Sequence, residues 1–395
     1  MRKVKTTLLT AVVAFVLSCG GGGSGGGDPG ALYFIADTGG GRSLWSYDIQ
    51  TGAITSSLGM TISSQGLFLY DGKIHFEEGG SLWNYDLASS VSTIVSDAYP
   101  WDERAAVYRD RLFFRYNDGV RGMELWSYEA SSRSSTIVED INPVGSDGSG
   151  VDFLTVYDDR LFFMAFRDDV GEELWYYDAS AGAVTLAADI NPSPGQGSGV
   201  DGLMVYDDRL FFSAYSSPNN RELWAYDSAS EAATLVIDLD PSGGSSPYSL
   251  TTDGEDLYFI ADDGTSGSEL WSYSAASDMA TQLTLLNPAA GQGISANQVA
   301  IYAGQVFFDA RTSSNYNLWS CDPDTGSTSL VFEGSLSSNG PMTVYGGDMF
   351  FWGELRGDSR GAELWTLSAP SFAPTMLVDF NPSGDGDPWY FLVVP

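Results

Sequence analysis

The sequence predicts an all-β protein that closes into an eight-bladed β-propeller of four-stranded antiparallel blades. Three observations support this prediction: a repeated unit of short strand-like segments, a tryptophan that recurs eight times, and complementary strands at the two ends of the repeat array. No stretch between residues 31 and 395 has a helical period or reads as a long linker. We therefore expect these residues to form one domain.

The repeated unit is clearest between residues 153 and 192. Two of its segments are separated only by Asp158-Asp159, and such residues tolerate the positive φ of a tight hairpin turn. The unit therefore predicts one blade of four antiparallel strands, with the first strand innermost and the last outermost. Its segments are rich in β-branched and aromatic residues and are bounded by Asp, Gly, Ser or Pro: Phe153–Tyr157, Arg160–Phe166, Glu173–Tyr177 and Val184–Ile190.

A Leu-Trp pair in the third segment marks every copy of the unit. Successive tryptophans lie 38, 43, 49, 49, 47, 48 and 46 residues apart, which is close to the length of a four-stranded propeller blade. Their constant place within a strand favours packing between blades over a role as exposed platforms for sugars. The eight residues are Trp45, Trp83, Trp126, Trp175, Trp224, Trp271, Trp319 and Trp365.

The two ends of the array predict how it closes. The first copy begins at its second segment, residues 31–36, and the chain finishes with a first segment, residues 389–394. These two pieces complete one blade, which removes the exposed strand edge of an open array. Seven blades with a peripheral hairpin are the alternative.

The repeat also resembles a known family. The run E-L-W-x-Y-D, with L-x-x-Y-D-x-R-L-F-F upstream and D-I-N-P downstream, resembles the E-L-W-x-x-D-G-T repeat of bacterial secreted and surface proteins. The resemblance covers nearly all of residues 31–395 and implies a β-propeller at the cell surface, without an established chemistry. The D-G-T part is replaced, for example by D-A-S at residues 178–180, so no role tied to it is carried over.

Residues 1–18 have the pattern of a lipoprotein signal peptide. Arg2, Lys3 and Lys5 precede an apolar run at residues 8–17 that is too short to span a bilayer. The run L-S-C-G then resembles a bacterial lipobox, and residues 19–30 would form a lipidated cysteine and a Gly/Ser tether. We expect an exported protein whose Cys19 anchors it to the lipid bilayer of the cell envelope, at the outer membrane or cell surface. A free secreted protein is the alternative.

The charge of the chain excludes one class of partner and suggests another. The sequence has 52 Asp and Glu against 18 Lys and Arg, a net charge of −34, which repels nucleic acid. Solubility alone explains this acidity, but Ca²⁺ prefers the carboxylate and carbonyl oxygens that acidic Gly-rich loops offer. Because the loops lack EF-hand spacing, simple turns are the alternative. The candidate calcium ligands are Asp118, Asp147, Asp168, Asp169, Asp262 and Asp263.

Few residues could carry out catalysis. The one histidine, His75, lies inside a strand segment, so histidine triads and multi-histidine metal sites are excluded. Cys321 stands where most repeats have Tyr, which indicates a buried substitution. A carboxylate pair could act as acid and base, but nothing singles one out. The repeated glutamate before Leu-Trp is expected to bind backbone N–H groups or an arginine: Glu124, Glu173, Glu222, Glu269 and Glu363.

These observations predict a non-enzymatic binding or adhesion module whose acidic loop face contacts an unknown protein or glycan, with calcium as a possible structural ligand. One alternative is a cation-assisted or two-carboxylate hydrolase or lyase acting on extracellular glycans or lactones. Another is an envelope scaffold that docks other proteins. Trp101, Trp352 and Trp389 lie outside the Leu-Trp series and are the candidates for exposed aromatic contacts.

Overall fold

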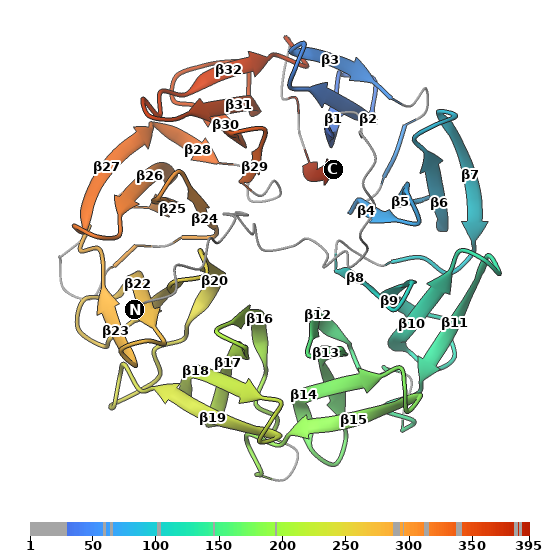
Figure 1. Cartoon of the computed structure of the whole chain (residues 1–395), viewed down its shortest axis with the longest axis vertical. Helices are drawn as coiled ribbons and strands as arrows, with labels where there is room; N and C mark the ends of the chain where they lie inside the picture. The colour runs from blue at the N-terminus through green and yellow to red at the C-terminus, as the bar shows by residue number, and fades with distance from the viewer. Residues whose placement is uncertain are drawn as a thin grey trace, which may run out of the picture.

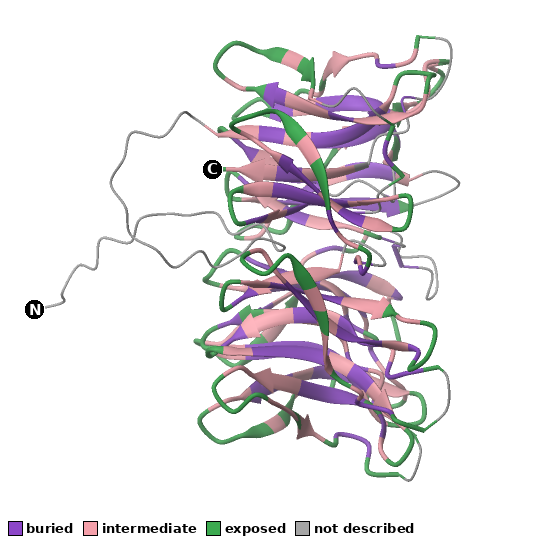
Figure 2. Cartoon of the chain, turned by 90° about the vertical axis from the view of Figure 1, so that its right-hand side faces the viewer, coloured by how far each residue is buried: buried purple, intermediate pink, exposed green. Residues whose placement is uncertain are grey.

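Eight β-sheets form a ring in the computed structural model (Figure 1). The structure describes residues 30–57, 61–63, 66–100, 104–144, 147–193, 196–286, 293–294, 296–311, 316–336, 342–382, 386 and 389–395. Seen from the side, the ring is a disc whose buried residues lie in the strands, while exposed residues gather in the connections on both faces (Figure 2). The prediction of eight blades is confirmed, and the alternative of seven blades is wrong.

Each blade contains four strand positions, from the centre of the ring to its rim. In blades 1 to 8 the inner strands are β33 (Trp389–Val394), β4 (Phe68–Tyr70), β8 (Ala105–Tyr108), β12 (Asp152–Tyr157), β16 (Asp201–Tyr206), β20 (Tyr248–Thr252), β24 (Val299–Tyr302), and β28 (Gly334–Leu336) together with β29 (Thr343–Tyr345). The second strands are β1 (Ala31–Asp37), β5 (Lys73–Glu78), β9 (Arg111–Asn117), β13 (Arg160–Arg167), β17 (Arg209–Ser217), β21 (Leu257–Asp262), β25 (Gln305–Arg311) and β30 (Asp348–Leu355).

The third strands are β2 (Arg42–Asp48), β6 (Ser81–Asp86), β10 (Met123–Glu129), β14 (Gly171–Asp178), β18 (Asn220–Asp227), β22 (Ser268–Ser274), β26 (Tyr316–Asp322) and β31 (Glu363–Ser368). The outer strands are β3 (Ala53–Ser56), β7 (Val91–Ser96), β11 (Ser134–Glu139), β15 (Ala183–Ala188), β19 (Ala232–Ile237), β23 (Met279–Gln282), β27 (Ser327–Phe332) and β32 (Thr375–Val378). Neighbouring strands within a blade pair antiparallel, as in blade 4, where Phe163 lies opposite Trp175.

The ring closes through a split blade, as predicted. Strand β33 from the C-terminal end pairs antiparallel with β1, with Ala31 opposite Val394 and Phe34 opposite Phe391. The ring of Trp352 stacks on that of Phe391, at a centroid distance of 5.3 Å and an interplanar angle of 6°. Trp352 is fully buried there, so the expectation of an exposed contact was wrong for this residue. Trp101 and the side chain of Trp389 lie outside the described residues.

Blade 8 departs from the four-strand prediction because its inner strand is in two pieces. Strand β29 pairs with the start of β30, and β28 pairs with its end, where Gly334 lies opposite Leu355. The sequence lacks D-I-N-P at this connection, and the chain passes directly from β27 into β28. A Cβ on Gly334 would lie only 2.1 Å from the carbonyl oxygen of Glu354, so this close approach requires glycine.

The apolar core lies between the blades rather than within them. Eight clusters of buried side chains each combine residues of two neighbouring blades, and each contains one tryptophan of the Leu-Trp series. Trp175, for example, packs with Tyr108 and Phe113 of blade 3. Burying one large apolar side chain contributes about 1.5–3 kcal/mol. Blade–blade contact is therefore the main source of stability.

Aromatic rings form the centre of most of these interfaces. Between blades 4 and 5, the ring of Phe162 on β13 lies 5.6 Å from that of Tyr157 on β12 and 5.2 Å from that of Tyr226 on β18. The same three strand positions supply Tyr108, Phe113 and Tyr177 between blades 3 and 4. Tilted and edge-on pairs of this kind contribute about 0.5–1.5 kcal/mol beyond the burial of their area.

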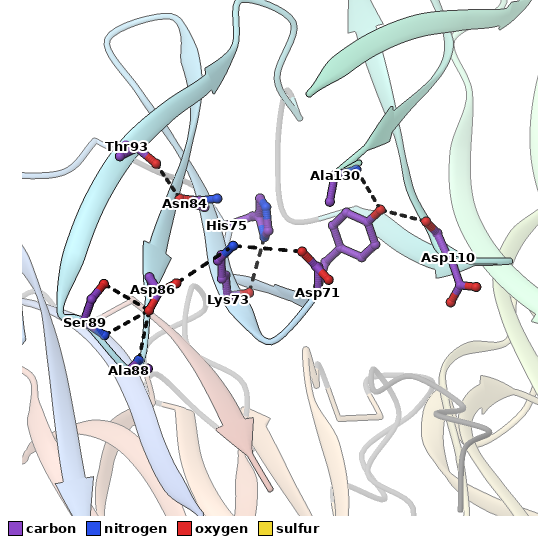
Figure 3. Close-up of polar contacts among 11 residues, drawn as sticks. Asp71, Lys73, His75, Asn84, Asp86, Ala88, Ser89, Thr93, Asp110 and Ala130 are labelled. Carbon is purple, nitrogen blue, oxygen red and sulfur yellow. Dashed lines mark hydrogen bonds and ion pairs between the residues drawn. The ribbon is translucent and has the colours of Figure 1, made fainter. Parts of the chain in front are cut away.

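A tyrosine hydroxyl also joins neighbouring blades, and we call this contact the tyrosine latch. The hydroxyl of Tyr157, at the end of β12, donates to the carbonyl oxygen of Asp208 (2.7 Å) and accepts from the N–H of Ser228 (3.3 Å), both in the next blade. The equivalent hydroxyl of Tyr70 lies between Asp110 and Ala130 (Figure 3). Five latches are present in the described structure, formed by Tyr70, Tyr108, Tyr157, Tyr206 and Tyr302.

The latch is missing on both sides of the split blade and between blades 6 and 7. The hydroxyl of Tyr345 is buried at the interface of blades 8 and 1 and has no hydrogen-bond partner among the described residues. The reason is topological, because blade 1 has no turn between its inner and second strands to supply the carbonyl oxygen. Val394 occupies the latch position between blades 1 and 2, and Asp253 occupies it between blades 6 and 7.

Two matched substitutions test the latch. Tyr157→Phe should lower the free energy of unfolding by about 1–3 kcal/mol, because it leaves a buried carbonyl oxygen and an N–H without their partner. Tyr345→Phe should leave stability unchanged or raise it, because it removes a buried hydroxyl that has no partner. Urea denaturation of the two variants measures the difference, and equal losses would contradict the latch.

Candidate functional site

Two kinds of connection meet on one face of the ring, which we call the loop face. The loops between second and third strands lie against the crossovers that lead from an outer strand to the next blade. At blade 3, the N–H of Met123 donates to the carbonyl oxygen of Asp147 (3.2 Å), and the N–H of Ser149 donates to that of Met123 (2.9 Å). Blade 4 repeats this with Ser198 and Glu172 (2.8 Å). These hydrogen bonds hold the loop face together.

A buried glutamate fixes both ends of the crossovers that follow blades 3, 4 and 5. The carboxylate of Glu173, which is 0% exposed, accepts hydrogen bonds from the N–H of Ile190 (3.0 Å) and from the N–H and hydroxyl of Ser198 (2.9 and 2.6 Å). Ile190 follows β15, and Ser198 precedes β16 of the next blade. Burial raises the pKa of Glu173, and the hydrogen bonds from Ser198 and Ile190 oppose that rise.

Five blades have this crossover glutamate, and the same five have Asn-Pro or Asp-Pro in the crossover sequence. Blades 1, 2 and 7 carry Ser43, Ser81 and Asn317 at the position instead. The predicted role, accepting hydrogen bonds from backbone N–H groups, is therefore what the structure shows for the repeated glutamates. The four further contacts are Glu124 with Ile141 and Ser149, Glu222 with Leu239 and Ser245, Glu269 with Thr284 and Leu286, and Glu363 with Phe380.

Glu173→Gln should destabilise the crossover of blade 4. The glutamine NH₂ group cannot accept the hydrogen bonds that Ile190 and Ser198 donate to the carboxylate. The substitution should therefore lower the free energy of unfolding by about 1–3 kcal/mol. Glu172→Gln is the matched control, since Glu172 is the preceding residue on β14 and its side chain is exposed. Urea denaturation should show a loss for Glu173→Gln alone, and an equal loss in both variants would contradict the role.

Two of the predicted calcium ligands act as caps within their own turns. Asp118 accepts hydrogen bonds from the N–H groups of Val120 (2.9 Å) and Arg121 (2.8 Å) and also pairs with the Arg121 guanidinium (2.6 Å). Asp263 accepts from the N–H groups of Thr265 and Ser266. Burial alone would raise the pKa of Asp263, but the hydrogen bonds from Ser266 and Thr265 lower it to about 2.

The other candidate ligands make different contacts with neighbouring groups. Asp169 pairs with Arg167 (2.5 Å), and Asp262 accepts from the N–H of Gly264 (2.8 Å). Asp168 lies beside Asn142 on the crossover from blade 3 to blade 4, and the carbonyl oxygen of Asp147 accepts from the N–H of Met123. In the part of the chain that the structure describes, no three His, Cys, Asp or Glu side chains are grouped as metal ligands. Calcium binding stays a prediction, as does lipidation of Cys19, which lies outside the described residues.

A comparison of two salts separates specific binding from general screening. Because Asp118, Asp262 and Asp263 already accept hydrogen bonds within their turns, CaCl₂ and MgCl₂ at equal ionic strength should raise the thermal unfolding midpoint by equal amounts. Differential scanning calorimetry gives the two midpoints. A dose-dependent rise with calcium alone would instead show a specific site in the native state.

His75 lies in the core between blades 2 and 3, at a position where most other blades have Phe. Its ring is 5.4 Å from that of Tyr70 and 5.7 Å from that of Tyr128. Its Nδ1 is 3.3 Å from the carbonyl oxygen of Lys73 (Figure 3). Burial lowers the pKa of His75 to about 4. The imidazole is therefore neutral at physiological pH and enclosed by aromatic rings, which does not suit a catalytic base.

His75→Phe should change the pH dependence of stability. The pKa of His75 in the folded protein lies below the ordinary value of about 6.5, so the stability contributed by neutral His75 is complete above pH 6.5 and is lost as the pH falls toward 4. At pH 4 the loss amounts to roughly 3 kcal/mol. The variant should lack this loss between pH 6.5 and 4. Thermal unfolding midpoints of both proteins across this range measure it, and parallel curves would contradict the assignment.

Cys321 is a buried substitution, as the sequence indicated. It is 0% exposed on β26, and burial raises the pKa of its thiol to about 11, so it remains protonated. Tyr258 lies in the same cluster and donates its hydroxyl to Asp253 (3.0 Å). Thus, at the interface of blades 6 and 7, Asp253 and Cys321 stand at positions that carry Tyr in most blades, and Tyr258 replaces Phe.

Two hollows lie on the surface of the ring. One, of about 540 Å³, is on the opposite face between blades 5 and 6 and is lined by Tyr206, Asp207, Gly254, Glu255, Asp256, Ser274, Ala275 and Ala276. The other, of about 240 Å³, is on the loop face and is lined by Asn191, Gln196, Gly197, Tyr215, Ser217, Pro218 and Asn219. Sequence reasoning did not single out either hollow. Within the described residues, no helix has the length and hydropathy that a membrane span requires.

The protein is a β-propeller. Its crossover glutamates and its single histidine are buried and make contacts that support the fold. Residues 30–337 match the model of the family described as outer membrane protein assembly factor BamB, so the protein belongs to that family. No curated protein sequence matches the chain. The resemblance to the E-L-W-x-x-D-G-T repeat and the signal peptide stay predictions.

Solved structures share the fold at low sequence identity. The chain is similar to an oligogalacturonate lyase in complex with manganese (TM-score 0.52, 13% identity, covering 87% of this chain and 99% of that chain). It is also similar to a puromycin hydrolase (TM-score 0.52, 15% identity, covering 80% of this chain and 53% of that chain). A puromycin-hydrolyzing peptidase of Mycobacterium tuberculosis is similar as well (TM-score 0.53, 11% identity, covering 81% of this chain and 54% of that chain). The chain spans about half the length of these two hydrolases, and the likeness shows the fold alone.

Proposed function

We propose that this chain is an exported, lipid-anchored β-propeller that binds other proteins at the bacterial envelope and is not an enzyme. The observation that carries this proposal is the family match over residues 30–337, because the family is described as an outer membrane protein assembly factor. The loop face is the proposed contact surface, since loops held on a rigid ring are the usual place for binding residues.

The chemistry of the described residues supports a non-enzymatic role. A general acid or base needs a titratable group within reach of a substrate, but His75 and the crossover glutamates are buried in the ring. Cys321 is buried as a protonated thiol. Asp118 and Asp263 cap their own turns. The lyase and hydrolase structures share only the fold with this chain, so they do not favour the alternative of a hydrolase or lyase.

The proposed anchor has its own test. The full chain, expressed in a bacterium with an outer membrane, should incorporate radioactive palmitate and fractionate with membranes. Cys19→Ser should abolish the label and release the protein into the soluble extracytoplasmic fraction. A Cys19→Ser variant that keeps both the label and the membrane location would contradict lipidation at this residue.

Photo-crosslinking in living cells tests protein binding. A photoreactive amino acid replaces Val120 or Val144, two side chains on the loop face that are 76% and 63% exposed. Val91 and Ile94 on the outer strand β7 serve as controls with similar exposure, 53% and 55%. We expect a discrete adduct with an envelope protein from the loop-face positions only. Equal yields from all four positions, or none, would contradict a protein contact on this face.

A further inference from the structure

The smaller hollow on the loop face differs from its surroundings in charge. It lies between the crossover from blade 4 to blade 5 and the hairpin formed by β17 and β18. Its side chains are amides, hydroxyls, one proline and one aromatic ring, without an ionised group. The chain as a whole carries a net charge of −34. A neutral polar hollow in such a protein suits a ligand that is rich in hydroxyl groups and carries no charge.

The hairpin of blade 5 is the source of this neutrality. Its loop sequence, S-S-P-N-N at residues 216–220, contains no acidic residue. The equivalent loops of blades 3, 4 and 6 contain Asp118, Asp168-Asp169 and Asp262-Asp263. Blade 5 therefore lacks the acidic residues of these other repeats and offers amides in their place.

The walls of the hollow are held in place by hydrogen bonds within the chain. Strand β17 is nine residues long, and its pairing with β18 extends to Ser217 opposite Asn220. On the other wall, the side-chain NH₂ of Asn191, which is 4% exposed, donates to the carbonyl oxygens of Gln196 and Gly197 (3.2 Å each). Because both walls are fixed, a ligand would bind without the cost of ordering them.

The aromatic ring of Tyr215 is fixed as well. The backbone N–H of Tyr215 donates to the carbonyl oxygen of Ser198 (2.8 Å), and the guanidinium of Arg221 lies 4.9 Å from the centre of the Tyr215 ring. Arg221 is itself held by the hydroxyl of Ser213 (2.8 Å) and by Asp201 (3.6 Å). The side-chain amides of Gln196 and Asn219, which line the same hollow, make no hydrogen bond to any described residue.

We propose that this hollow binds one ring of a neutral sugar. An aromatic ring offers its face to the C–H groups of a sugar, and an amide can donate to one hydroxyl and accept from another. The volume of about 240 Å³ is below the roughly 300–1,000 Å³ of sites for drug-sized ligands, and so fits a single ring. The negative field of the protein disfavours uronic acids. The site does not depend on the proposed protein binding at the envelope.

The test uses the full chain carrying Cys19→Ser, which avoids the proposed lipid anchor. Saturation-transfer NMR is run with the methyl glycosides of glucose, galactose, mannose and N-acetylglucosamine, and with methyl glucuronide. We expect at least one neutral glycoside to bind saturably with a Kd of roughly 1 mM, and the glucuronide not to bind. The same NMR measurement with a neutral oligosaccharide of the sugar that binds then shows whether the hollow binds the end of a sugar chain as well as the single sugar.

Substitutions place the binding at the hollow. Gln196→Ala and Asn219→Gly should each raise the Kd of the sugar about tenfold, because each removes the hydrogen bonds of one amide. A tenfold change in Kd corresponds to about 1.4 kcal/mol of binding free energy. Glycine suits position 219 because the backbone there has φ of +65°, so only the amide is lost. Tyr215→Ala should abolish binding, and Tyr215→Phe should keep it.

The matched control is Phe166→Ala, because Phe166 in blade 4 is the equivalent of Tyr215 in blade 5. The backbone N–H of Phe166 donates to the carbonyl oxygen of Ser149 (2.7 Å), and the loop that follows Phe166 is acidic. This variant should bind the sugar as the parent chain does. The proposal is overturned if no neutral glycoside binds at concentrations well above 1 mM, or if binding survives Gln196→Ala, Asn219→Gly and Tyr215→Ala together. Either result leaves the palmitate and crosslinking outcomes unaffected.

Discussion

The packing of aromatic side chains between neighbouring blades is the interaction on which the ring depends. No blade encloses a core of its own, because every buried cluster takes residues from two blades. Stability is then close to a sum of interface contributions, as in other repeat proteins. This constraint explains why Asp253, Tyr258 and Cys321 differ from the repeat together, since a change of volume at one position requires a change at its neighbours.

The loop face follows a different principle, because hydrogen bonds to buried carboxylates hold it, not apolar packing. A crossover glutamate secures only the two ends of its connection, as Glu173 does through Ile190 and Ser198. The residues between these ends are free to differ in chemistry without loss of the fold. The smaller hollow illustrates this freedom, since Asn191, Gln196 and Gly197 line it and lie between Ile190 and Ser198. A scaffold built in this way separates stability from recognition.

Sequence patterns predicted the strands, the eight blades and the split closure, because these depend on local periodicity and on the order of segments. They did not predict the burial of Trp352, the division of β28 from β29, or the latch acceptor of each tyrosine, because these depend on which groups meet across an interface. The hollow at Tyr215 was missed because Asn, Gln and Ser are ordinary turn residues. Its one signal was the neutral S-S-P-N-N loop, where the loops of blades 3, 4 and 6 contain aspartates.

The split blade makes the ring a natural subject for circular permutation. Gly30 and Val394 are so close that a Cβ on Gly30 would lie 1.9 Å from the Val394 carbonyl oxygen. A short turn that joins residues 395 and 30 would complete blade 1 and supply Tyr345 with an acceptor. Opening the chain at Asp158-Asp159 would instead remove the acceptor of Tyr108, which is the Asp159 carbonyl oxygen. The position of the unpartnered tyrosine would therefore move with the chain ends.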